Sequence, residues 1–388
     1  VENSYYTNHT LNCRNCYLLF GGGNDEDCLF SRFMSGCKDT VDALSLYFCQ
    51  WCYEAIASQE CYRCFFLQNC RNCSDCLMVE DCTGCKNCIC CFGLNNKEYC
   101  VLNELIGKEA FERRKAELGI LTNTKIAALR AQLEQFRLQL PHRASHIYGS
   151  ESCTGDMLFN SRNCEHAFDS TDCENCKFIC YTPKGSNSQD CTYNAPDGVQ
   201  WCYNVGSSVG TMNAMSTFLS WYGDSLYYSR ECHHCSDIFG CISMRRKKYC
   251  ILNKQYTNEE YEQLVPKIIE HMRKTGEWGE YFHPSLSYMG YNETVADELL
   301  PLPRETVLRN GWRWYDGQEK KEAYLGPLIP VPEDITSVGD DICESILTCS
   351  VSGKPFKIIP QELKFYRTMG LPLPTICPDE RHKKRVAR

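Results

Sequence analysis

The chain has 388 residues, a formal net charge of −8 and 31 cysteines. This length allows two or three domains with a substantial core. The acidic balance argues against a surface that binds nucleic acid throughout. The sequence contains no apolar run of about eighteen residues, the length that a membrane-spanning helix needs. The chain starts with Val1 rather than Met, so we expect it to begin inside a longer gene product.

Between Cys61 and Cys100 the cysteines recur at intervals that are nearly all multiples of three. An α-helix cannot use this period, because its faces recur every 3.6 residues. A β-solenoid can, because each coil returns small inward side chains to the same stacked position. Cys64, Cys82 and Cys100 lie eighteen residues apart. We therefore predict a β-solenoid with eighteen residues in each coil, built as two nonapeptide sides or three hexapeptide sides.

The cysteines allow three interpretations. A disulfide framework is usual in short secreted domains, whereas this chain is long and its cysteine count is odd. Metal ligation suits the CxxC pairs. Cysteine is also small and easily buried, so it suits the filling of a narrow solenoid interior. We favour interior packing.

The chain contains a tandem duplication with an offset of 150 residues. The segment Lys97–Asn103, which ends the first cysteine-rich stretch, is repeated as Lys247–Asn253, and Phe111 aligns with Tyr261 beyond it. The cysteines at 82, 85, 91 and 100 have counterparts at 232, 235, 241 and 250. A solenoid followed by a helix is therefore expected twice.

The fold class that we predict is mainly β, with helical insertions after each solenoid half. Helices are expected over 109–118 and 124–140, and another begins at the capping box that Thr257 forms with Glu260. The predicted parts are a first cysteine-rich β-solenoid segment (1–106), a helical hairpin (107–149), a second such segment (150–256), a helix with an aromatic and proline-rich linker (257–333), and a degenerate zinc-ribbon-like module with a basic tail (334–388).

The last part resembles a zinc ribbon, in which two CxxC knuckles supply four ligands to a tetrahedral ion. Ser352 and Glu380 stand where the second cysteine of each knuckle belongs. The remaining candidate ligands are Cys349, Cys377 and either His382 or Cys343. Because serine is a poor zinc ligand, we favour a ribbon without metal, with an unorthodox zinc site at His382 as the rival interpretation.

The run Cys232, His233, His234, Cys235 is a second candidate metal site, since imidazole and thiolate together suit zinc. These cysteines also occupy the solenoid register, and the histidines fill ordinary positions of the repeat. We favour the structural interpretation.

Two basic tracts suggest contacts with RNA phosphates. The first is Arg245–Lys248, and the second lies at the C-terminus, where a ribbon-like module precedes it. The residues of the second tract are Arg381, Lys383, Lys384, Arg385 and Arg388. Both tracts are also compatible with ordinary solvated surface. The HExxH, GxSxG and P-loop signatures of enzymes are absent.

Several motifs are spread over the whole chain, namely Glu2–Asn8, Asn15–Leu18, Lys97–Asn103, Lys247–Asn253, Gly276–Glu280, Tyr291–Thr294 and Gly353–Phe356. Together they resemble those of an uncharacterised family of cysteine-rich, zinc-ribbon-containing proteins from candidate-phyla bacteria with small genomes. The resemblance implies a cytoplasmic protein with reduced thiols and further ribbons upstream of Glu2. It implies no activity.

The leading hypothesis is a non-enzymatic scaffold that docks a macromolecular partner, either a protein or RNA or a ribonucleoprotein, and makes no membrane contact. The second hypothesis is a thiol-rich metal-binding protein, with zinc as the cofactor. The third is a carbohydrate-active β-helix, which rests on fold analogy and requires carboxylates grouped on one exposed face.

Overall fold

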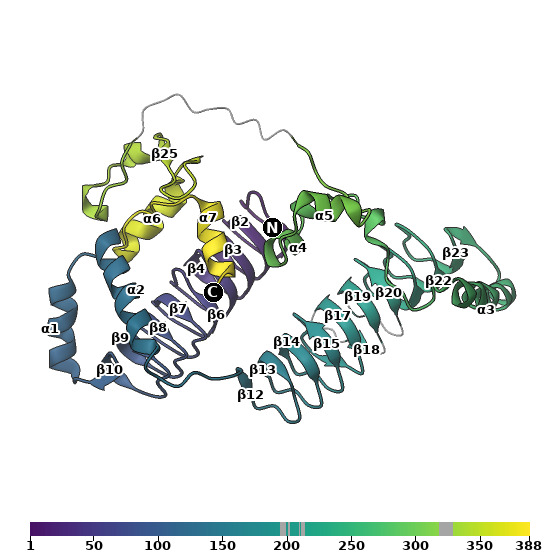
Figure 1. The fold of residues 1–388 in the computed structure, drawn as a ribbon, viewed down its shortest axis with the longest axis horizontal. Coiled ribbons are helices and arrows are strands. Elements are labelled where there is room, and N and C mark those ends of the chain that lie inside the picture. The colour runs from purple at the N-terminus through teal and green to yellow at the C-terminus, as the bar shows by residue number, and fades with distance from the viewer. Residues whose placement is uncertain (195–198, 201, 209, 211–213, 318–328) are drawn as a thin grey trace. The chain divides into compact units, whose positions relative to one another are not determined.

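The computed structural model describes residues 1–194, 199–200, 202–208, 210, 214–317 and 329–388. This part of the chain forms two compact units (Figure 1). The first unit comprises Val1–His142, Val295–Pro301 and Asp316–Arg388, and the second comprises Arg143–Thr294 and Leu302–Tyr315. Each unit contains a sheet of mostly parallel strands, so the prediction of a mainly β, cysteine-rich fold is confirmed.

In the first sheet, each strand pairs in parallel with a strand from the next repeat, and the last strand turns back antiparallel. Its strands are β1 (Asn8–Leu11), β2 (Tyr17–Gly23), β3 (Glu26–Ser35), β4 (Lys38–Val41), β5 (Leu44–Tyr47), β6 (Ile56–Gln59), β7 (Phe65–Gln68), β8 (Leu77–Glu80), β9 (Lys86–Phe92), β10 (Glu98–Val101) and β11 (Glu104–Leu105).

The second sheet has the same organisation. Its strands are β12 (Ile147–Tyr148), β13 (Gly155–Phe159), β14 (Glu165–Thr171), β15 (Lys177–Cys180), β17 (Gln189–Asn194), β19 (Tyr203–Ser208), β20 (Met215–Phe218), β21 (Asp224–Tyr227), β22 (Ser236–Phe239), β23 (Lys248–Ile251) and β24 (Lys254–Gln255). Strands β16 (Gly185–Ser186) and β18 (Val199–Gln200), which precede and follow β17 in the chain, form a separate parallel pair.

Most structural repeats contain twelve residues, so the predicted coil of eighteen is wrong; the pair β12–β13 has an offset of eleven and the pair β17–β19 an offset of fourteen. Phe65 pairs with Leu77, and Asp224 pairs with Ser236, in each case twelve residues further along the chain. The spacing of eighteen was misleading because cysteines occupy more than one inward column. Two cysteines six triplets apart therefore lie in different columns.

A left-handed residue at every third position explains the twelve-residue return. Arg63, Phe66, Asn69 and Asn72 have φ values of 51°, 60°, 54° and 50°. Each such residue bends the chain, and four triplets bring it back beside its starting point. This conformation is unfavourable for most L-residues. The corner N–H groups are hydrogen-bonded to the previous repeat, as the 3.0 Å bond from Arg63 to the Gln50 carbonyl shows.

Hydrogen bonds at the inward positions explain why cysteine and serine are used there. The N–H of Cys61 donates to Sγ of Cys49 at 3.5 Å, and the N–H of Cys70 donates to Oγ of Ser58 at 3.1 Å. The Cys61 thiol donates in turn to the Gln59 carbonyl at 3.3 Å. An inward thiol or hydroxyl thus replaces a missing strand hydrogen bond. All cysteines are free thiols, and all but three are buried.

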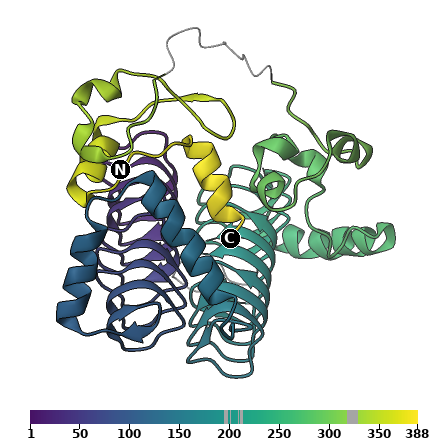
Figure 2. The same ribbon diagram turned by 60° about the vertical axis from the view of Figure 1, so that its left-hand side comes forward.

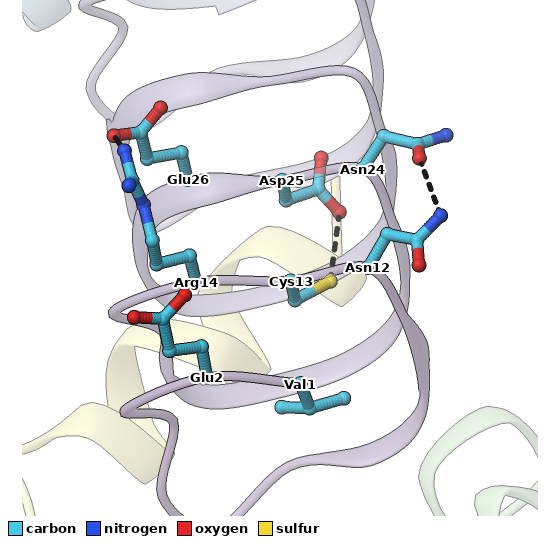
Figure 3. Close-up of a pocket in the computed structure, with 8 residues that line it drawn as sticks. All are labelled: Val1, Glu2, Asn12, Cys13, Arg14, Asn24, Asp25 and Glu26. Carbon is cyan, nitrogen blue, oxygen red and sulfur yellow. Dashed lines mark hydrogen bonds and ion pairs between the residues drawn. The ribbon is translucent and has the colours of Figure 1, made fainter.

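Outward side chains twelve residues apart form ladders along each sheet. Figure 3 shows two of them near the start of the first sheet. Arg14 makes an ion pair with Glu26 in one column, and Asn12 donates to Asn24 at 3.1 Å in another. Adjacent repeats are therefore held together by side chains as well as by the backbone.

Asp25 is an unusual inward residue, because it places a carboxyl group in a column of cysteines (Figure 3). It accepts the N–H of Cys37 at 2.9 Å and lies 3.9 Å from the Cys13 sulfur. Burial raises the pKa of Asp25 to about 6.

An asparagine acts as a cap at the last turn of each sheet, between β10 and β11 in the first sheet and between β23 and β24 in the second. The side-chain amide of Asn253 exchanges two hydrogen bonds with the backbone of Ile242, at 2.8 and 3.0 Å. Asn103 does the same with Phe92. This explains the repeated terminator, since the amide takes the place of one further strand at an otherwise exposed edge.

The helices after each sheet support the predicted duplication. Helices α1 (Lys108–Leu118) and α2 (Asn123–Arg137) pack along β8–β10 (Figures 1 and 2), and α3 (Asn258–Thr275) packs against β23. The Phe111 ring lies 5.7 Å from that of Tyr99, and the Tyr261 ring lies 5.8 Å from that of Tyr249. The predicted capping box of α3 is present.

The region predicted as a separate ribbon-like module shares one core with the first sheet. Its elements are η3 (Ile335–Ser337), η4 (Asp340–Cys343), β25 (Leu347–Thr348), β26 (Pro355–Phe356), α6 (Pro360–Met369) and α7 (Pro378–Val386). Helices α6 and α7 lie over β4 and β3.

The predicted linker region contains η1 (Pro284–Leu286), η2 (Tyr291–Glu293), α4 (Val295–Leu299) and α5 (Arg304–Arg309). Its segment 318–328 lies outside the described residues. No helix in the described part of the chain is long and apolar enough to cross a membrane.

Candidate nucleic-acid interface

The predicted zinc ligands of the last module come together only in part: the thiols of Cys349 and Cys377 lie beside each other, whereas His382 does not join them. Cys349 and Cys377 are both buried, and Oγ of Ser352 lies 3.8 Å from the Cys377 sulfur. His382 contacts Glu298 instead, at 3.2 Å. Helix α7 begins at the residue after Cys377, so a residue five positions further along it faces another direction. The site with His382 is therefore corrected, and no cluster of three or more His, Cys, Asp or Glu side chains suited to a metal occurs in the described residues.

The second candidate metal site is separated by the repeat itself. Cys232 and Cys235 occupy inward positions and are buried, whereas His233 and His234 lie on the outside between them. The thiols donate to the carbonyls of Arg230 and His233 respectively. Sulfur and imidazole therefore face opposite ways, and the prediction of a joint site is corrected.

The predicted RNA contact at the C-terminus is wrong for two of its five residues, Arg381 and Arg385. Arg381 and Arg385 are 2% and 3% exposed, and they make ion pairs with Asp42 and Glu362 beneath α7. These arginines dock the helix onto the first sheet and are closed to phosphate.

The other three basic residues of this tract differ in their contacts. Lys383 pairs with Glu380 at 3.0 Å, and an Arg388 guanidinium nitrogen lies 4.0 Å from Glu54. Lys384 is exposed on α7. This tract therefore offers a phosphate little free charge.

The histidines of the second run belong to two outward columns of the second sheet. In one column the Trp221 and His233 rings lie 4.7 Å apart, and Arg245 follows one repeat later. In the adjacent column the Tyr222 and His234 rings lie 5.1 Å apart at an interplanar angle of 18°. We call this surface the aromatic–arginine face; its residues are Trp221, Tyr222, His233, His234, Arg245 and Arg246.

The rings of Trp221 and Tyr222 remain open to solvent, whereas His233 is half-buried. Trp221 is 40% exposed and Tyr222 is 52% exposed. Burial and the neighbouring Arg245 lower the pKa of His233, so this imidazole is neutral at pH 7. The positive charge of the face therefore comes from its arginines.

These arginines differ from several other ladder cations of the second unit, although Lys184 and Lys254 likewise have no ion pair within the described residues. Arg162, Lys177 and Lys248 are each within 4 Å of an acidic partner, namely Glu151, Glu165 and Asp237. Arg245 and Arg246 are exposed, and the described residues provide neither with an ion pair. Local positive charge is left uncompensated in an acidic chain.

The first copy of the duplication shows that the fold does not require this composition. The column equivalent to Trp221, His233 and Arg245 has the same parallel bridges but reads Arg71, Thr83 and Asn95. The adjacent column, equivalent to Tyr222, His234 and Arg246, consists of Asn72, Gly84 and Asn96. The aromatic and cationic side chains are thus a property of the second copy.

Sequence reasoning singled out both histidines and the tract at Arg245 but missed Trp221 and Tyr222. A spacing of twelve residues joins positions 221, 233 and 245, and likewise 222, 234 and 246. The correct repeat length would have revealed the face.

Comparison with known proteins gives no family for the chain. No family model matches it, and no curated protein matches it at a significant level.

Proposed function

We propose that the chain is a non-enzymatic β-solenoid scaffold that docks a phosphate-bearing macromolecule, RNA or a ribonucleoprotein, on the aromatic–arginine face. The twelve-residue repeat supports the scaffold part of this proposal. Its strands, thiols and outward ladders bond each repeat to the next, so side chains on one face keep a fixed spacing.

The observation that carries the proposal is the placement of two arginines without an ion pair, among the described residues, in the same columns as exposed aromatic rings. Arg245 and Arg246 follow the rings of Trp221 and Tyr222 at repeat spacing. Arginine binds phosphate strongly, and exposed aromatic rings add contact area at low entropic cost. An anionic partner with planar groups fits this combination.

The two rival hypotheses gain no comparable support. Metal binding requires thiolates that converge, whereas inward thiols such as Cys82 and Cys88 donate to the carbonyls of Glu80 and Lys86. A carbohydrate-active groove requires grouped carboxylates, whereas outward carboxylates such as Glu165 are neutralised within their ladders. Membership of the candidate-phyla family remains a proposal that rests on the sequence motifs.

Photo-crosslinking from Tyr222 tests the docking surface. Benzoylphenylalanine at position 222 is compared with the same group at Phe178, because both residues are exposed, left-handed corners of the second sheet with φ values of 52° and 53°. We expect adducts from position 222 that disappear when Arg245 and Arg246 are changed to Glu. Equal adducts from both positions, or adducts insensitive to the charge reversal, would contradict the proposal.

A further inference from the structure

We infer that the aromatic–arginine face binds single-stranded RNA, with unpaired bases against Trp221 and Tyr222 and with phosphates at Arg245 and Arg246. This inference rests on the proposed function and names its ligand and its mode of recognition. Duplex RNA is not a ligand of this mode.

The ring spacing favours unstacked bases. The ring pairs on this face are separated by 4.7 and 5.1 Å, the spacing of neighbouring strands. Successive bases in a nucleic-acid helix are about 3.4 Å apart. A stacked helix therefore does not match the ladder, whereas a flexible single strand places each base separately. Proteins that bind single strands combine such rings with a cationic track.

The positions of the charges define the path of the strand. Arg245 and Arg246 are two repeats beyond Trp221 and Tyr222, a distance of about 10 Å at the usual strand spacing. Lys247 extends the exposed positive charge to the next residue. The RNA is therefore expected to run along the columns, with two or three of its nucleotides in contact with the face.

The combination of aromatic rings and arginines on this face agrees with single-stranded RNA as the ligand. An acidic peptide would be attracted by the arginines, but it would leave the rings of Trp221 and His233 without planar partners. A neutral glycan would use the rings and leave Arg245 unpaired. Single-stranded RNA supplies both planar bases and phosphates, and it satisfies the whole face.

Fluorescence anisotropy of the full chain with a labelled oligouridylate of about ten nucleotides tests the inference. Trp221→Ala is expected to weaken binding about fivefold or more, and Trp221→Phe should restore most of the loss. Arg245→Ala should lower the salt dependence by about 0.7 in the logarithmic slope. Lys177→Ala, which removes an exposed cation that is paired with Glu165, serves as the matched control.

The outcomes separate this inference from the proposed function. Binding of the single strand over a matching duplex, with the predicted loss in Trp221→Ala, supports the inference. Equal binding of both forms, or full binding by Trp221→Ala, overturns it while phosphate docking still stands. If neither form binds, the inference fails, and the crosslinking at Tyr222 decides the proposed function independently.

Discussion

Replacing Asp42 by Asn tests how the C-terminal helix is held on the first sheet. The two carboxylate oxygens of Asp42 lie 2.7 Å from Arg385 and 2.9 Å from Arg381. Arg381 also lies 2.8 Å from Glu362, and all four side chains are almost fully buried. The cluster contains two guanidinium groups and two carboxyl groups.

The substitution leaves two buried guanidinium groups facing one carboxylate. Removing one partner of a buried ion pair costs about 3–5 kcal/mol, and we expect a loss of this size in Asp42→Asn. Asparagine keeps the shape of the side chain and tolerates the left-handed backbone of this position, whose φ is 59°. The loss therefore measures charge rather than strain.

Asp75→Asn is the matched control. Asp75 also has a left-handed backbone, with φ of 51°, but its ion pair with Arg63 at 3.6 Å lies at the surface, with the Asp75 side chain only half-buried. Such a pair contributes about 1 kcal/mol or less. Urea unfolding gives the free energies, and trypsin should cleave after Arg381 and Arg385 faster in Asp42→Asn. If the two variants lose the same stability, the buried cluster does not dock the helix as described.

Three further predictions concern the repeat. Burial raises the pKa of Asp25 to about 6, so the stability that its protonated form contributes is lost as the pH rises through 6. Asp25→Asn should therefore stabilise the fold by about 3 kcal/mol at pH 8 and change its stability little at pH 4. Equal effects of the substitution at both pH values in urea unfolding would refute this. Asn253→Gly keeps the left-handed cap but removes two hydrogen bonds, so unfolding should cost about 1–3 kcal/mol less than in the native chain; an unchanged urea midpoint would show that the amide does not cap the sheet. Thiol alkylation of the folded chain should be confined to Cys153, Cys180 and Cys343, and mass-spectrometric detection of early labelling in the inward columns would contradict the packing role of the cysteines.

The period of three was predictable because it follows from the shape of the repeat. Many inward positions carry cysteine, so the spacing of Cys82, Cys85 and Cys88 records the triplet directly. The number of triplets per repeat leaves a weaker trace, because serine, alanine, leucine and cysteine all occupy inward columns. The left-handed corners are rich in Asn and Asp, but they also accept residues as different as Arg63 and Phe66, so their composition signal is diluted.

The position of the candidate site depended on that repeat length. His233 and Arg245 were visible as separate motifs, but only a spacing of twelve residues places Trp221 in the same column. The basic tail was wrongly predicted to be a phosphate-binding surface. Composition does not reveal that Arg385 is buried against Asp42, a residue more than three hundred positions earlier in the chain.

Hydroxyl-radical footprinting of the full chain, with and without single-stranded RNA, tests the central claim most directly. The method reports the solvent exposure of individual aromatic and histidine side chains. RNA should protect Trp221, Tyr222 and His234 together, while the equally exposed Phe178 keeps its reactivity. Protection elsewhere with these three side chains unchanged, or no protection at all, would contradict the assignment of the aromatic–arginine face as the docking surface.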